Sequence, residues 1–167
     1  GVALELAGLD WRVVQKNLVT EEGITVPGFR ANLRETDNQV LGVVSDRYKV
    51  VQNEEAFAFT DELLGKGVTY ETAGSLQNGR RTWILAKLPT RYIISGDEIT
   101  PYLVFMNSHD GSGAIKAAMT PIRVVCQNTL NLALSTAKRC WATNHTGDIR
   151  GKLEDAKNTL LYADKYM

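Results

Sequence analysis

The feature that most constrains the fold is a hairpin signature in the middle of the chain. Asn78-Gly79 separates two runs, VTYETAGSL and RTWILAKL, that are rich in β-branched and apolar residues. An Asn-Gly pair tolerates positive φ at both central positions of a tight two-residue turn, so the two runs are predicted to pair as antiparallel strands.

Similar patterns surround this hairpin. FRANLR places Phe29, Ala31 and Leu33 on one face and polar side chains on the other, which is typical of a half-buried strand. The turn-forming stretch ETDNQ then leads into VLGVVS as a partner strand. Further strands are predicted at VVQKNLV, RYKVV, YIIS, ITPYLVFMNS, GAIKAAMTPIRVV and RCWATNH.

Helices are predicted at residues 53–66, 128–138 and 148–167. Asn53 can cap the first of them, with Glu54 and Glu55 in its first turn and Lys66 near its end. The order of elements predicts an α+β fold: a curved antiparallel sheet built from hairpins, with two to three helices packed on one face. Since no linker or repeat interrupts the chain, residues 1–167 are expected to form a single domain.

The charge balance does not by itself indicate a polyanionic partner. Lys and Arg together number 19, as do Asp and Glu, so the formal net charge is +0. A nucleic-acid site would therefore depend on local clustering of basic residues. No apolar run approaches the roughly 20 residues that a membrane-spanning helix needs, and a cytoplasmic protein is expected.

The stretch NSHDGSGAIKAAMTPIRVVCQNTL holds the densest group of candidate ligand-binding residues. Hydrogen-bonding side chains lie at a turn that contains Gly111 and Gly113, two basic residues follow on the next strand, and amides begin the next helix, where anions are favoured. These candidates are Asn107, Ser108, His109, Ser112, Lys116, Arg123, Gln127 and Asn128. The alternative is a polar turn that touches no ligand.

A second group combines basic and aromatic residues. Arg47 and Lys49 flank Tyr48, and Arg80 and Arg81 precede Trp83. Basic side chains that follow phosphates, with rings on which bases stack, are typical of proteins that bind single strands. We therefore expect nucleic-acid binding, most of all to single-stranded DNA, with no catalytic residue, metal or cofactor assigned.

Two alternatives stay open. One is a metal-dependent, nuclease-like enzyme centred on His109 and Asp110, with His145 as a possible third ligand. The other is an interaction or inhibitor module that docks a host protein through an exposed sheet edge.

Three motifs carry a family resemblance: S-x-x-Y-x-V-x-Q-N from Ser45 to Asn53, N-S-H-D-G-S from Asn107 to Ser112, and RVVCQNTL. With them the chain resembles the phage/plasmid-like protein family, a domain of unknown function, which implies carriage on phages and plasmids. The order of three strands and a helix is also similar to single-strand-annealing recombinases. That similarity implies a basic groove along a β-hairpin sheet, assembly into a homo-oligomeric ring or filament, and a role in mobile-element DNA recombination or replication.

Overall fold

The computed structural model describes residues 2–64, 69–87, 92–94, 97–99, 101–137 and 139–161. The elements in these ranges are, in chain order, α1 (Val2–Ala7), β1 (Val13–Val19), β2 (Thr25–Arg34), β3 (Gln39–Ser45), α2 (Asn53–Leu64), β4 (Thr69–Leu76), the 3-10 turn η1 (Gln77–Gly79), β5 (Arg81–Lys87), β6 (Tyr92–Ile94), β7 (Asp97–Ile99), β8 (Tyr102–Ser108), β9 (Ile115–Thr120), α3 (Gln127–Thr136), β10 (Arg139–Thr143) and α4 (Ile149–Leu161).

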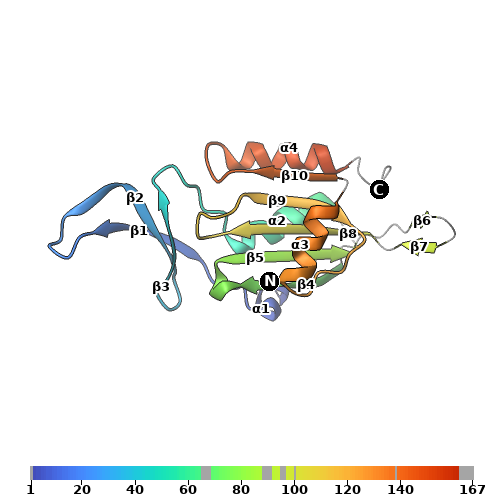
Figure 1. The fold of residues 1–167 in the computed structure, drawn as a ribbon, viewed down its shortest axis with the longest axis horizontal. Helices are drawn as coiled ribbons and strands as arrows, with labels where there is room; N and C mark the ends of the chain where they lie inside the picture. Colours follow the sequence, from blue (N-terminus) through green and yellow to red (C-terminus); the bar gives the residue numbers. More distant parts are fainter. Residues whose placement is uncertain are drawn as a thin grey trace.

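The α+β class is confirmed, with antiparallel strand pairs (Figure 1). The largest sheet has five strands in the order β10-β9-β8-β5-β4. β1, β2 and β3 form a separate three-stranded sheet, and β6 pairs with β7. None of the helices in the described ranges is both long enough and apolar enough to cross a membrane.

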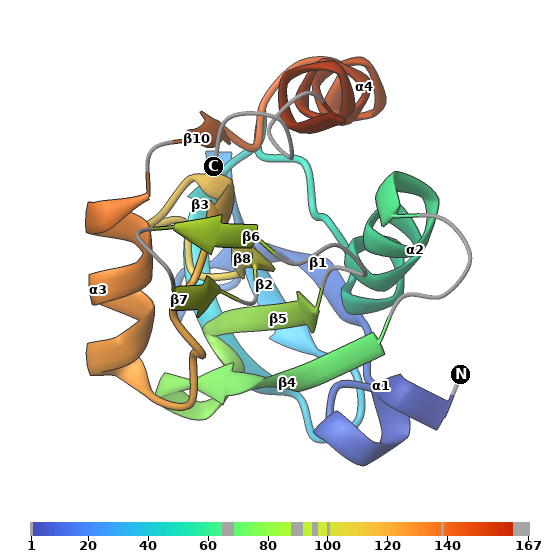
Figure 2. The same ribbon diagram turned by 90° about the vertical axis from the view of Figure 1, so that its right-hand side faces the viewer.

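The five-stranded sheet has helices on both faces, not on one face as the sequence predicted. Phe59 of α2 packs on Phe105 of β8 in one core cluster, whereas Leu130 of α3 and Val104 of β8 belong to the other. Figure 2 shows α3 on one side of this sheet and α2 on the other. The apolar runs WILA and LVFM are continuous, as expected for central strands that are covered on both faces.

The hairpin between β4 and β5 is confirmed, but the tight two-residue turn expected for it is wrong, because the connection has four residues. Leu76 and Arg81 form its last strand pair, and residues 77–80 connect them. Asn78 has φ 59° and Gly79 has φ 92°, the left-handed conformations that this dipeptide was expected to supply.

The helices that begin near Asn53 and Asn128 are confirmed as α2 and α3, although Lys66 and Lys138, at their expected ends, lie outside the described residues. The strand expected at residues 47–51 is wrong: this segment forms a turn and an extended connection with no strand partner in the described part of the chain. Tyr48 is the reason, because its side chain turns into the interior between the two larger sheets.

Candidate nucleic-acid interface

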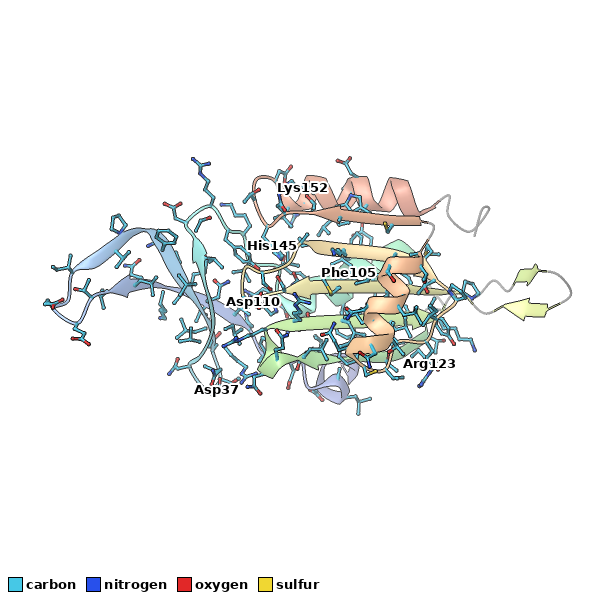
Figure 3. The ribbon with its side chains drawn as sticks, in the orientation of Figure 1. Asp37, Phe105, Asp110, Arg123, His145 and Lys152 are labelled. Atoms are coloured by element: carbon cyan, nitrogen blue, oxygen red, sulfur yellow. The ribbon has the colours of Figure 1, made fainter. Side chains whose placement is uncertain are left out.

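A buried polar cluster, here called the hub, joins the three-stranded sheet to the five-stranded sheet. Its members come from β2, the β3–α2 connection, the start of α2, the end of β8 and the β10–α4 loop, and each is less than a tenth exposed: Asn32, Tyr48, Asn53, Asn107, Ser108, His109 and His145. Figure 3 shows His145 and Asp110 at the end of the five-stranded sheet that lies next to β3.

Asn53 determines the tautomer of His109. Its Nδ2 donates to the carbonyl oxygen of Leu9 at 3.2 Å, so its Oδ1 is the acceptor that lies 2.8 Å from His109 Nε2. His109 Nε2 therefore carries the proton, and Nδ1 is an acceptor. Nδ1 is buried and has no hydrogen-bond partner among the described residues, while the ring packs edge-on against Trp11.

Asn107 holds His145 in the same way. Asn107 Nδ2 donates to the carbonyl oxygen of Val51 at 2.8 Å, and its Oδ1 accepts from His145 Nε2 at 2.6 Å. The His145 ring stacks on Tyr48 with ring centroids 4.5 Å apart. The Tyr48 hydroxyl donates to the carbonyl oxygen of Ser108 at 2.5 Å, so the two ends of the hub are connected.

The ionisable side chains of the hub are neutral at pH 7. Burial lowers the pKa of His109 to about 4, an effect that His145 increases and Asp110 opposes. Burial also lowers the pKa of His145 to about 4, although Asp110 opposes this shift. Burial, reinforced by Asp110, raises the pKa of Tyr48 above its ordinary value.

The three-stranded sheet reaches the hub through its polar face. Asn32 donates to the carbonyl oxygen of His109 at 2.8 Å and accepts from Gln15 at 3.1 Å. Gly42 of β3 lies so close to the backbone of Asp110 that a Cβ atom there would be only 2.5 Å from its Cα. Glycine at this position therefore permits the two sheets to meet.

The hub accounts for three of the candidate ligand-binding residues. Asn107, Ser108 and His109 are each 0% exposed and bonded to other parts of the chain, so they lie inside the protein and away from its surface. Ser112 is exposed, and its backbone N–H and hydroxyl both donate to the carboxylate of Asp110. The metal alternative lacks support here, because the described residues contain no group of three His, Cys, Asp or Glu side chains that could hold an ion.

Backbone hydrogen bonds to hub residues hold the segments that carry several of the basic candidates. The carbonyl oxygen of Arg80 accepts the His109 N–H at 2.7 Å, and the Lys49 N–H donates to the carbonyl oxygen of His145 at 2.5 Å. Arg81 pairs with Ser108 in the sheet. Six basic residues on the segments that meet at the hub form no salt bridge with a carboxylate in the described part of the chain. These six, here called the collar, are Arg30, Arg47, Lys49, Arg80, Arg81 and Lys116.

The remaining candidates are elsewhere. Gln127 and Asn128 are the first two residues of α3, and Arg123 lies in the connection between β9 and α3. Figure 3 shows Arg123 at the opposite end of the five-stranded sheet from Asp110. Arg123 also forms an ion pair with Glu71, 3.0 Å between Nε and Oε1.

The two aromatic rings that were expected to stack on bases, those of Tyr48 and Trp83, lie in the interior of the protein. Tyr48 is 8% exposed and Trp83 is 9% exposed, so both are core residues. Arg30, a basic residue on the strand predicted at FRANLR, lies in β2 two residues before Asn32 of the hub. Phe29, next to it, is 49% exposed.

The comparison with known proteins identifies a family but no activity. A family model described as "Domain of unknown function (DUF932)" matches residues 40–167, a region that includes the five-stranded sheet and both hub histidines. No curated protein and no solved structure matches the chain.

Proposed function

Because the chain belongs to the DUF932 family, whose description assigns no activity, we propose a function from the charges around the hub. The protein binds nucleic acid, and single-stranded DNA above all, through the collar. The resemblance to the phage/plasmid-like family and to annealing recombinases supports placing this binding in the recombination or replication of a mobile element, in the cytoplasm and within a ring or filament.

The observation that carries the proposal is a local excess of positive charge in a chain without net charge. The six segments that meet at the hub are residues 9–13, 30–34, 45–53, 78–81, 107–116 and 144–147. They contain eight basic residues and three acidic ones, against 19 of each in the whole chain. Arg12 and Arg34 form ion pairs with Glu54 and Asp37, and the other six cations form the collar. Such clustering is what a phosphate backbone requires when the net charge is zero.

The state of Arg81 supports the same proposal. The residue is partly exposed and is within salt-bridge distance of no carboxylate in the described part of the chain, although its Nε is buried and has no hydrogen-bond partner there. Arginine is well suited to a ligand contact because its planar fork of donors matches a phosphate group.

A single strand fits the collar better than a duplex does. The collar side chains come from separate parts of the chain: β2, the β3–α2 connection, the β4–β5 connection, β5 and β9. A flexible single strand can bend to follow cations arranged in this way, whereas bending a stiff duplex costs free energy.

Fluorescence anisotropy with a labelled oligothymidine tests the proposal. Affinity should fall steeply between 50 and 200 mM salt, since counterions are released on binding. The double variant Lys49→Ala/Arg80→Ala should weaken binding at low salt and reduce the slope of log K against log salt by about 0.7 for each lost phosphate contact.

The matched control removes two positive charges at the other end of the five-stranded sheet. Lys87→Ala/Arg123→Ala changes the net charge equally but leaves the collar intact, so its salt slope should equal that of the wild type. Folded protein that does not bind at the lowest salt would reject the proposal. Equal losses in the two double variants would reject the collar as its site.

A further inference from the structure

The three-stranded sheet turns toward the hub the face that holds Gln15, Asn32 and Arg34 together with the buried Val13 and Val44, and its other, mainly apolar face points outward. The strand register places three rows of side chains on this outer face: Val14, Leu33 and Val40; Lys16, Ala31 and Val43; and Phe29 with Ser45. Phe29, Val40 and Val43 are each about half exposed. In Figure 1 this sheet extends from one end of the molecule, away from the helices that cover the five-stranded sheet.

Hydrogen bonding explains why the sheet has this orientation. Gln15, Asn32 and Arg34 lie on the inner face, where they bond to Tyr48, His109 and Asn78 respectively through backbone oxygens. Buried polar groups must find such partners, so the polar face has to be the inner one. Phe29, Val40 and Val43 are therefore left half exposed on the outer face, whereas Ala31, between Lys16 and Val43, is buried.

The size of the outer face indicates what kind of ligand it fits. Three strands and three rows span roughly 10 Å by 14 Å between backbone positions, or roughly 200 Å² with side-chain margins. A stable contact between proteins needs about 800 Å² from each partner. A sheet platform that stacks two or three unpaired bases is about as large as this face.

The charges on and beside the face fit the same ligand. Lys16 is the one charged residue in the three rows, and it is positive. Ser45, the strand partner of Phe29, leads into a turn with one acid, Asp46, and two bases, Arg47 and Lys49, which both belong to the collar. A strand whose phosphates follow Lys49 and Arg47 would thus arrive beside the ring of Phe29.

We propose that the outer face of the three-stranded sheet receives the bases of the single strand whose phosphates contact the collar, and that Phe29 is the ring on which a base stacks. This inference rests on the proposed function. Aromatic rings stack on every base, so the face would bind without sequence preference.

The test uses two oligonucleotides of equal length and charge, an oligothymidine and a strand in which abasic residues replace the thymidines. Phe29→Ala should weaken binding of the oligothymidine about five-fold or more, the lower end of what one stacked base contributes. It should leave the affinity for the abasic strand and the salt slope of both strands unchanged. Phe29→Trp should restore the affinity for oligothymidine.

Val125→Ala is the matched control, because Val125 is also half exposed but precedes α3, away from the three-stranded sheet. It should change neither affinity. Salt-sensitive binding that Phe29→Ala does not alter would overturn the inference and leave the proposed function intact, and no binding of either strand would reject both. If sedimentation shows that Phe29→Ala dissociates an oligomer while oligothymidine affinity is unchanged, the face is a contact between copies and the inference is wrong.

Discussion

Acid should destabilise this protein well above the pH at which its carboxylates titrate, because both of its histidines are buried and neutral. In the folded state the pKa of His109 and that of His145 are each about 4, against 6.5 for a solvated imidazole. At pH values between 4 and 6.5, the histidines of the unfolded chain bind protons that those of the folded chain do not bind. The free energy of unfolding must therefore fall as the pH drops below about 6.5 and stop falling, for these groups, near pH 4.

The size of the effect follows from the shift. Each histidine costs about 1.4 kcal/mol for each pH unit below 6.5, so at pH 5.5 the two together should cost about 3 kcal/mol. The chain contains 2 histidines, so no other imidazole contributes. That loss is a large share of the 5–15 kcal/mol that stabilises a typical domain.

Urea denaturation monitored by tryptophan fluorescence, at pH 7.5, 6.5 and 5.5, measures the loss. His145→Gln should be less stable at pH 7.5 because the hub is altered, but its loss between pH 7.5 and 5.5 should be about half that of the wild type. NMR of the imidazole nitrogens provides a direct check, since both rings should be Nε2–H tautomers at pH 6. A free energy of unfolding that stays level from pH 7.5 to 5.5, or imidazoles that titrate near 6.5, would refute the assignment of buried neutral histidines.

Two further predictions concern the junction of the sheets. Gly42→Ala should destabilise the fold by about 3 kcal/mol or more, because its Cβ would overlap the Asp110 backbone, which cannot move aside as a flexible side chain can. Urea denaturation should show a lower midpoint. A midpoint like that of the wild type would contradict the close approach of Gly42 to Asp110. Tyr48→Phe should cost about 1–3 kcal/mol, because it leaves the buried Ser108 carbonyl without its donor, and an unchanged thermal midpoint would show that this hydrogen bond is dispensable.

Local signals in the sequence were sufficient for the elements themselves. The β4–β5 hairpin depends on the backbone preferences of Asn78 and Gly79, and the start of α2 on the acids Glu54 and Glu55, all of which act over a few residues. The capping role expected of Asn53 is wrong, because its side chain bonds to Leu9 and His109, and Glu55 instead accepts the Gln52 N–H. The motifs that suggested a family also contain residues of the hub, among them Tyr48, but the motifs alone did not show that these side chains meet.

The roles of the polar residues depended on contacts between distant parts of the chain. Asn107 bonds to Val51 and to His145, which are 56 and 38 residues away, and this is why it is buried. An asparagine that binds a ligand and one that bonds to a distant backbone have the same chemistry in the sequence, so only the fold could distinguish them. The same applies to His109, and to Tyr48 and Trp83, whose rings were expected at the surface.

The three-stranded sheet separates most clearly what the sequence determines from what the tertiary structure determines. The alternation of FRANLR divides β2 into an apolar face and a polar face, because successive side chains of a strand point to opposite sides. It does not determine which face is covered. The tertiary structure turns the face with Asn32 and Gln15 inward, where these side chains bond to each other and to the backbone of His109 and Tyr48, and it leaves Phe29 and Val43 at the surface. Here the requirement that buried polar groups be paired outweighs the gain from covering a small apolar face.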